Sequence, residues 1–439
     1  MLNLKDMFKS LIFPKGAETI RGALLRTSFL NLLARLFGYL KQLSIAILFG
    51  FNYHTDAFFM ALSFIGIFLI FVDVFDSLGI PNLVSAKQKG EEDFKKLAGL
   101  LLSFTTLLAV ALTVLSILLY PLLSRIPVGF DEKALESLKV SYFLLLPYLF
   151  SSFFFHHFGA ILRSLRRFTA YFVGELMFSL FTFVFTALGL WLYGFHLVLP
   201  IALSLANIIA TIYMLIVGKD FLHYSFFFDQ RVKQILKQFL YLLALYGVFH
   251  LVTLVDRAFT SLLGEKGISA LTYGYMLAFA LKGVLKVEHM AITALSESKS
   301  NIKVLNKFAK FSLLVSLPAT LILFFFPEIP VALLFGHGKF QLKDIHLTAE
   351  AVRFYSLSLF FAFFWAILYR AFQVMNYLMP VFFIALIGII INGVANYVFV
   401  VLYKLGIAGI CLGTFVASIV LSSLSYFFLY LRSKKNYNI

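Results

Sequence analysis

Charged side chains inside long apolar stretches are the residues of this sequence most suited to chemistry. Arg35 and Lys41 interrupt the first such stretch, which begins near Phe29. A charge in the middle of a bilayer costs at least about 2.5 kcal/mol, so such residues commonly mark the path of a substrate or an ion. Six residues rotate a continuous helix by about 240°, so the two cations would point in different directions unless the helix breaks near Gly38. Arg35 could instead extend to the membrane surface, which would leave Lys41 as the deeper cation.

A second group of basic residues lies on one helical stripe. Lys282, Lys286 and His289 are spaced by four and three residues, which places them on one face of a helix. Charged side chains are unfavourable against lipid, so we expect this face to line a water-filled cavity. Lys286 and His289 could alternatively reach the inner membrane surface. Asp256 and Arg257 form an adjacent acid and base in the preceding stretch. The excess of cations favours an anionic cargo such as a diphosphate, for which Lys and Arg supply donors.

Two acids lie toward one end of the second apolar stretch. Asp73 and Asp76 are three residues apart and therefore share a helix face. They could line the cavity, bind a cation, or pair with the basic residues of the following loop. We assign them to gating or helix pairing.

Membrane-spanning helices must position these side chains, because the composition excludes a water-soluble fold. Of the 439 residues, 61% are hydrophobic and only 13% are charged, whereas soluble domains are about half apolar and a quarter charged. The apolar runs are continuous, which predicts about twelve spanning helices of about 20 to 28 residues rather than a barrel. These predicted spans begin near Phe29, Ala57, Leu97, Ser137, Phe168, Phe195, Ile235, Ile268, Phe308, Leu347, Tyr377 and Leu405.

The basic residues predict the orientation of the chain. They cluster at both ends and in alternate loops, and by the positive-inside rule these parts face the cytoplasm. Gly159–Arg163 is echoed by Trp365–Arg370 about 206 residues later, which supports two halves of six helices each, a common plan of transporters. The predicted parts are a basic cytoplasmic lead 1–28, an N-lobe 29–218, a cytoplasmic linker 219–234, a C-lobe 235–430 and a basic cytoplasmic tail 431–439.

Several other functions are disfavoured. The net charge of +16 would suit nucleic acid, but the basic residues lie in short clusters between apolar runs, so no nucleic-acid partner is expected. The single cysteine, Cys411, excludes a disulfide framework. The neighbours His156 and His157 diverge by about 100° on a helix, so we expect no metal site there. The sequence contains no P-loop and no nucleophile elbow, so we expect a transporter and not an enzyme.

Short motifs follow one another in a fixed order over nearly the whole chain. They are Arg35–Gly38 with Lys41, Leu48–Gly50, Thr55–Phe59, Pro147–Phe150, Gly159–Leu162, Arg166–Phe168, Leu334–Phe340 and Gly406–Ile410. Each motif is weak alone, but their order and spacing resemble those of the MurJ (MviN) lipid II flippases of the MOP exporter superfamily.

The resemblance implies an all-helical, V-shaped bundle of two lobes that moves lipid II from the inner to the outer leaflet by alternating access. A central cationic cavity would bind the diphosphate and sugar head while the polyprenyl tail stays in lipid. Arg35 and Lys41 match first-span arginines of the family, although a lysine loses the bidentate phosphate geometry of arginine. Asp56 matches an acid at the outer end of the first hairpin, with a role in gating or helix pairing.

The resemblance also implies partners and a coupling ion. Asp256, Asn392 and Asn396 fall near positions of the family's sodium site, so sodium is the one ion that we expect to act with the protein. The expected partners are lipid II or a related polyprenyl-diphosphate glycolipid, together with membrane lipids. We expect a monomer in the bacterial inner (cytoplasmic) membrane, with both termini in the cytoplasm.

Two departures from the family leave the cargo open. The family's second-span arginine pair falls on an apolar run around Leu69 and Ile70, and its eighth-span Asp-Arg falls on Tyr275–Met276. Either Lys282 or Arg257 supplies the missing cations, or the cargo differs. The alternatives are a flippase of another polyprenyl-diphosphate-linked oligosaccharide and a multidrug or metabolite antiporter, although an antiporter of cationic drugs would need acids in the cavity.

Overall fold

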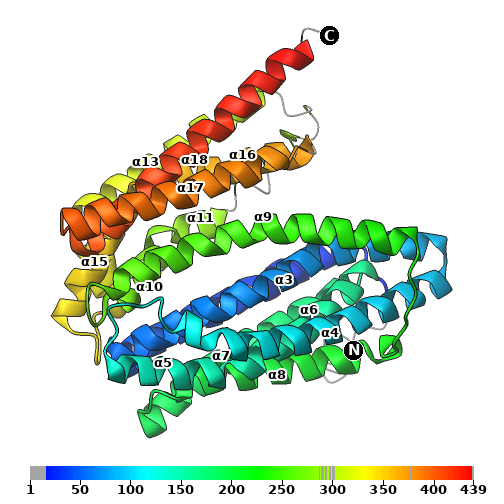
Figure 1. Cartoon of the computed structure of the whole chain (residues 1–439), viewed down its shortest axis with the longest axis horizontal. Helices are drawn as coiled ribbons and strands as arrows, with labels where there is room; N and C mark the ends of the chain where they lie inside the picture. The colour runs from blue at the N-terminus through cyan, green and yellow to red at the C-terminus, as the bar shows by residue number, and fades with distance from the viewer. Residues whose placement is uncertain are drawn as a thin grey trace, which may run out of the picture. The chain divides into compact units, whose positions relative to one another are not determined.

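The computed structural model describes residues 16–285, 287, 291, 294–295, 298, 302–375 and 377–437. A few helix positions within these ranges have no described side chain, and Asp73 and Asp76 are among them. The described chain is helical almost throughout and contains no β-strand (Figure 1). The predicted all-α fold is therefore confirmed.

Most of the predicted spans correspond to long apolar helices. Among the described residues, nine helices are long and apolar enough to cross a membrane, and the pair α15 (Leu342–Ser356) and α16 (Leu359–Val374), bent by 51°, would make a tenth. The other two predicted spans coincide with α9 (Gln230–Ser261) and with the interrupted pair α10 (Gly267–Ala278) and α11 (Ala280–Leu285). These helices are consistent with the predicted twelve spans without establishing that number.

The chain divides into two compact units that exchange short segments. Unit 1 comprises the described parts of Met1–Gly50, Ala61–Arg125 and Leu135–Tyr246, and unit 2 comprises those of Phe51–Met60, Ile126–Ala134 and Gly247–Ile439. Three helices, α3, α5 and α9, therefore run from one unit into the other. The lobe boundaries that we predicted from the sequence stay a prediction.

Unit 1 is held together by apolar packing and by polar groups between helices. Its elements are α2 (Ile20–Ser44), a π-helical turn (Ile45–Phe49), most of α3 (Tyr53–Lys89), α4 (Glu91–Leu123), most of α5 (Glu132–Leu144), α6 (Leu146–Ser164), α7 (Phe168–Tyr193), α8 (Val198–Val217), a 3₁₀ turn (Lys219–Phe221) and the first part of α9. α7 packs along both α2 and α8. The buried Asn207 amide of α8 donates to the hydroxyls of Ser151 (2.7 Å) and Ser152 (3.1 Å) on α6. Such hydrogen bonds stabilise helix pairs where water is excluded.

Unit 2 contains the second half of the bundle. Besides its parts of α3, α5 and α9, it contains α10, α11, α13 (Ile302–Phe325), α14 (Glu328–Phe335), α15, α16, α17 (Met379–Asn396), a π-helical turn (Tyr397–Leu402) and α18 (Gly406–Tyr437). α17 and α18 lie side by side, and α15 packs against both α10 and α18 (Figure 1). At the α10–α15 contact, a Cβ atom on Gly274 would lie 2.4 Å from Cβ of Ala351. A glycine is therefore needed for this close helix approach.

The surface of α13 is suited to lipid. Leu314, Leu317 and Leu321 follow one another at helical spacing and are all exposed, Leu314 by 73%. An apolar stripe of this kind would be unfavourable in water, and in a bilayer it meets hydrocarbon.

The close α10–α15 contact predicts the effect of one added methyl group. Gly274→Ala should lower the free energy of unfolding by about 1–3 kcal/mol, because Ala351 leaves no room for the new Cβ atom. Gly247→Ala is the matched control, since nothing lies within 4 Å of its Cβ position in α9, and the protein should keep or slightly gain stability. Thermal melting of the purified variants in detergent measures both effects. Equal melting temperatures for the two variants would contradict the tight α10–α15 contact.

Candidate functional site

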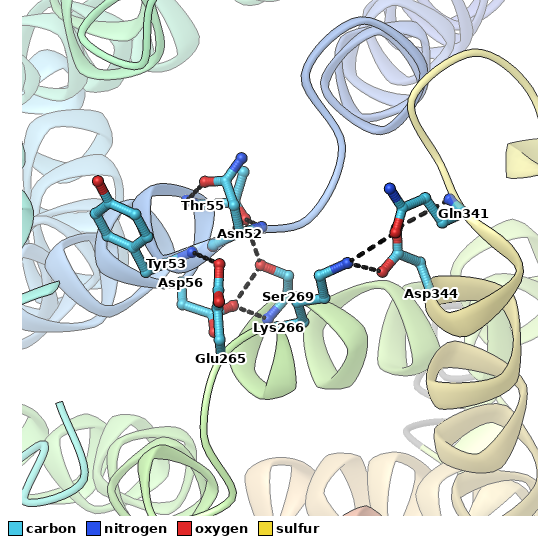
Figure 2. A network of polar contacts seen from close by, with 9 residues as sticks. All are labelled: Asn52, Tyr53, Thr55, Asp56, Glu265, Lys266, Ser269, Gln341 and Asp344. Carbon is cyan, nitrogen blue, oxygen red and sulfur yellow. Dashed lines mark hydrogen bonds and ion pairs between the residues drawn. The ribbon is translucent and has the colours of Figure 1, made fainter. Parts of the chain in front are cut away.

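The N-terminus of α10 is capped by a side chain from a distant part of the chain. Its own N-cap residue, Lys266, has a left-handed backbone (φ 77°) and makes no side-chain capping bond. Instead, Oδ1 of Asp56 on α3 accepts hydrogen bonds from the Ser269 backbone N–H (2.8 Å) and from the Ser269 hydroxyl (2.5 Å) (Figure 2). A carboxylate at this place satisfies a free N–H group of the helix and interacts favourably with its dipole. Asp56 thus joins α3 to α10 within unit 2.

The start of α3 receives a cap in return. Oδ1 of Asn52 accepts hydrogen bonds from the backbone N–H groups of His54 (2.9 Å) and Thr55 (3.2 Å). The Tyr53 backbone N–H donates to a carboxylate oxygen of Glu265, which precedes α10 (3.0 Å; Figure 2). Each helix therefore begins on an acid that the other segment supplies.

A third helix joins the same network. Nζ of Lys266 lies 2.9 Å from Oδ1 of Asp344, whose side chain is almost completely buried. Asp344 also accepts the Gln341 backbone N–H (3.0 Å) as part of the capping box of α15. We refer to Asn52, Tyr53, Thr55, Asp56, Glu265, Lys266, Ser269, Gln341 and Asp344 as the helix-cap network (Figure 2). It fixes the starts of three helices relative to one another inside unit 2.

Arg257 of α9 binds the same segment of α3 further along. Its guanidinium donates to the backbone carbonyl of Phe59 and to the Thr272 hydroxyl (3.4 Å). A charged guanidinium forms stronger hydrogen bonds than a neutral donor. Arg257 therefore has a structural role besides its predicted place in the cavity.

One cavity of unit 2 brings together three of the predicted site residues. It has a volume of about 430 Å³, and Asp256, Arg257 and Lys282 are among its lining residues. The lining also includes Thr272, Tyr275, Phe279, Tyr355, Trp365, Thr414 and Ser418. We call this the unit 2 cavity. Arg257 and Lys282 therefore line one space, while their predicted binding role stays a prediction.

The carboxylate of Asp256 is surrounded by oxygen- and nitrogen-bearing side chains. Oδ1 accepts hydrogen bonds from the amides of Asn392 (3.0 Å) and Asn396 (2.8 Å), and Oδ2 accepts one from the Thr414 hydroxyl (3.0 Å). The predicted trio therefore meets in space, and Thr414 is a fourth member that the sequence did not reveal. A Cβ atom on Gly413 would lie 1.9 Å from Oδ1 of Asn396, so a larger residue there would displace this amide.

The cluster fits a small monovalent cation. Oδ1 of Asn396 is buried and has no hydrogen-bond partner among the described residues. A half-turn of either amide presents its oxygen in place of its NH₂ group, and oxygen ligands suit hard cations. One carboxylate balances one positive charge.

The cations of the first span lie in unit 1. α2 continues through Gly38 without a break, so Arg35 and Lys41 project from different faces, about 120° apart around the helix axis. Arg35 is exposed and its Nε lies 3.5 Å from the Asn31 side-chain oxygen, whereas Lys41 is half-buried in the last turn of α2. Their binding of a diphosphate stays a prediction.

Three predicted site residues cannot be placed. Lys286 lies outside the described residues, and the side chains of Asp73 and Asp76 do as well. Their predicted roles in binding, gating or helix pairing stay predictions.

Apolar spanning helices with buried charges around a cavity are typical of polytopic membrane transporters. The fold agrees with solved transporter structures. A lipid II flippase MurJ in an inward closed conformation superposes with a TM-score of 0.79 at 21% identity, over 92% of this chain and 87% of the other. An inward-facing multidrug resistance MATE family transporter of the MOP superfamily gives a TM-score of 0.71 at 16% identity, over 92% and 95% of the two chains.

Sequence comparison then establishes the family. The family model for lipid II flippase MurJ matches residues 45–438. The probable lipid II flippase MurJ of Aquifex aeolicus (strain VF5) is 30% identical over 347 residues, which cover 74% of this chain and 67% of that relative. The chain belongs to the MurJ family of lipid II flippases. It is a multi-pass protein of the bacterial inner membrane, and its family consists of transporters and not of enzymes, as predicted.

The helix-cap network predicts a stability difference between two capping aspartates. Asp56→Ala should lower the free energy of unfolding by about 1–3 kcal/mol, because the buried donors of Ser269 lose their acceptor. Asp56→Asn should retain most of the stability, since the amide oxygen can still accept. Asp229→Ala is the matched control: Asp229 caps the Val232 N–H of α9 (2.8 Å) from an exposed position, where water can replace it. Equal losses of melting temperature for Asp56→Ala and Asp229→Ala would contradict the buried cap.

Proposed function

We propose that this protein transports lipid II, the lipid-linked precursor of peptidoglycan, from the inner to the outer leaflet of the cytoplasmic membrane by alternating access. The observation that carries this proposal is the unit 2 cavity, in which Arg257 and Lys282 share one space. A diphosphate removed from water needs several charged donors, and Lys and Arg supply them. Membership of the MurJ family supports lipid II as the cargo that brings this diphosphate.

The charge balance of the cavity argues against an exporter of cationic drugs. Among the described lining residues of the unit 2 cavity, Asp256 is the one acid, against two bases, Arg257 and Lys282. Arg257 and Lys282 therefore dominate the field in the cavity. An anion is attracted there and a cation is repelled.

Asp56 has a second role in this proposal, at the outer end of the bundle. The helix-cap network holds Phe51–Met60 on α10 through Asp56 and Glu265, and Arg257 holds the same segment through Phe59. In this proposal, opening toward the outer leaflet releases this segment from α10. Since each contact is a hydrogen bond between polar groups, water that enters on opening can replace it.

The orientation follows from the basic residues, and we place both termini in the cytoplasm. Residues 1–28 and 431–439 are rich in Lys and Arg, as are the alternate loops. In this orientation the helix-cap network lies at the outer side. We propose that the protein acts as a monomer.

We also propose that Asp256, Asn392, Asn396 and Thr414 bind a sodium ion that couples transport to the sodium gradient. Their oxygen atoms are suitable ligands, and Asn396 has a buried oxygen without a partner among the described residues. Bound sodium would supply a positive charge that reinforces the attraction of the cavity for an anion. The residues themselves link α9, α17 and α18.

Transport should depend on the charge of two lysines. Lys282→Ala and Lys41→Ala should each abolish rescue of a bacterium depleted of its lipid II flippase, because a donor to the diphosphate is lost. Lys282→Arg and Lys41→Arg should retain rescue, since the charge is kept. The measurement follows lipid II exposure on the outer leaflet together with the amount of inserted protein.

The outcomes of this rescue experiment separate the hypotheses. Full activity of both alanine variants would overturn the cationic cavity. Failure of the inserted wild-type protein to rescue would overturn lipid II as the cargo and favour another polyprenyl-diphosphate glycan. Lys139→Ala is the matched control, because Lys139 is an exposed lysine of α5 outside the unit 2 cavity, and it should retain full activity.

Sodium should stabilise the purified protein more than potassium does at equal ionic strength. A ligand that binds only the folded state at 100 times its Kd adds about 2.7 kcal/mol to the free energy of unfolding. The melting temperature should therefore be higher in NaCl than in KCl. Asp256→Asn should abolish this difference, whereas Asp229→Asn, which changes an exposed cap, should preserve it. Identical melting of the wild-type protein in both salts would rule the sodium site out.

A further inference from the structure

Aromatic rings line a large part of the unit 2 cavity. Ring centroids of Tyr275 and Phe279 are 4.5 Å apart, and Tyr355 lies 5.6 Å from Tyr275 and 5.9 Å from Phe279. Trp365 of α16 lines the same cavity as these three residues and is half-buried. α16 packs on α11, which carries Lys282. The cavity therefore combines aromatic faces with basic side chains.

The polar side chains of the cavity restrict the kind of guest. Thr272, Thr414 and Ser418 place hydroxyl groups on the same lining as the rings. Each of these hydroxyls donates to a neighbouring group of the protein, at 2.7 to 3.0 Å. Its oxygen can still accept a hydrogen bond from a guest, which a purely apolar guest cannot offer. A cation over the aromatic faces would be repelled by Arg257 and Lys282. A neutral guest with both apolar and hydroxyl-bearing faces is the one that suits the whole lining.

A sugar ring has these two kinds of surface. Its axial C–H bonds form an apolar face that packs flat on an aromatic ring, and its hydroxyl groups lie around the edge, where they donate and accept hydrogen bonds. Indole presents the largest such surface of any side chain. The nearby cations suit a phosphate attached to the sugar.

We propose that the unit 2 cavity contains a saccharide subsite in which the indole of Trp365 stacks on a sugar ring of the phosphate-linked head group. This inference rests on the proposed function and deepens it, because it assigns the sugar to Trp365 and the phosphate to Arg257 and Lys282. Tyr355 is buried among its aromatic neighbours, whereas Trp365 is half-buried and Tyr275 is exposed by 53%. Trp365 and Tyr275 therefore retain surface for a guest, and Trp365 offers the larger ring.

The sequence provides a direct reporter for this contact. It contains two tryptophans, and the other one, Trp191 of α7, is 71% exposed and belongs to unit 1. Trp191→Phe leaves Trp365 as the single indole fluorophore of the full-length protein. Purified lipid II should change the emission of this variant, whereas undecaprenyl diphosphate, which carries the diphosphate without sugar, should bind and leave the emission unchanged.

A binding assay with the purified protein tests the same contact independently. Trp365→Ala should weaken the apparent affinity for lipid II about tenfold or more, and Trp365→Phe should restore most of it because a flat ring remains. The affinity for undecaprenyl diphosphate should be the same in all three proteins. Trp191→Ala is the matched control and should behave as the wild-type protein.

The possible results separate failure of the saccharide subsite from failure of the proposed function. If lipid II binds, as measured by its co-purification with the protein, but neither the emission nor the affinity depends on Trp365, the saccharide subsite is overturned and the proposed function stands. Equal emission changes with both lipids would also overturn the subsite, because the indole would then respond without a sugar. If neither lipid binds the wild-type protein, the proposed function and the subsite fail together.

Discussion

Inside a bilayer a charged side chain finds no water, so every buried charge of this chain needs partners from the protein itself. The structure meets this constraint in three places within unit 2. Oδ1 of Asp56 binds the start of α10, Arg257 binds a backbone carbonyl of α3, and Asp256 binds two amides and a hydroxyl from α17 and α18. Each charge thereby joins helices that lie far apart in the sequence. The charges that suit the protein for an anionic cargo also determine which helices pack together.

The sequence was sufficient to predict the class of fold and the charged part of the site. A charge within an apolar run is conspicuous, so Asp256, Arg257 and Lys282 could be selected from the sequence alone, and the cavity unites them. Asn392 and Asn396 followed from the resemblance to the family, because an asparagine in an apolar helix does not reveal its partner. The approximate positions of most spans followed from hydropathy, since the length of a span is fixed by the thickness of the bilayer.

The rest of the site could not be predicted, for physical reasons. Thr414 also bonds the Ile410 carbonyl of its own helix (3.3 Å), as threonines in apolar helices commonly do, so its link to Asp256 has no local signature. The cap between Asp56 and Ser269 joins residues 213 positions apart, and no periodicity records such a contact. With 55 phenylalanines and 18% aromatic residues, the chain also hides the few rings that face a cavity. Only packing distinguishes Trp365 and Tyr275 from the rings that face lipid.

The passage of α3, α5 and α9 through both units has a mechanical consequence. The boundaries between the units fall inside these helices, after Met60, Ala134 and Tyr246. No flexible loop lies at these three points to permit a movement of one unit against the other. A helix instead resists bending through its hydrogen-bonded backbone. All three helices must therefore bend together when one unit moves. Because three helices bend together, their resistances add, and any displacement of one unit from its resting position costs more than it would with a single continuous helix.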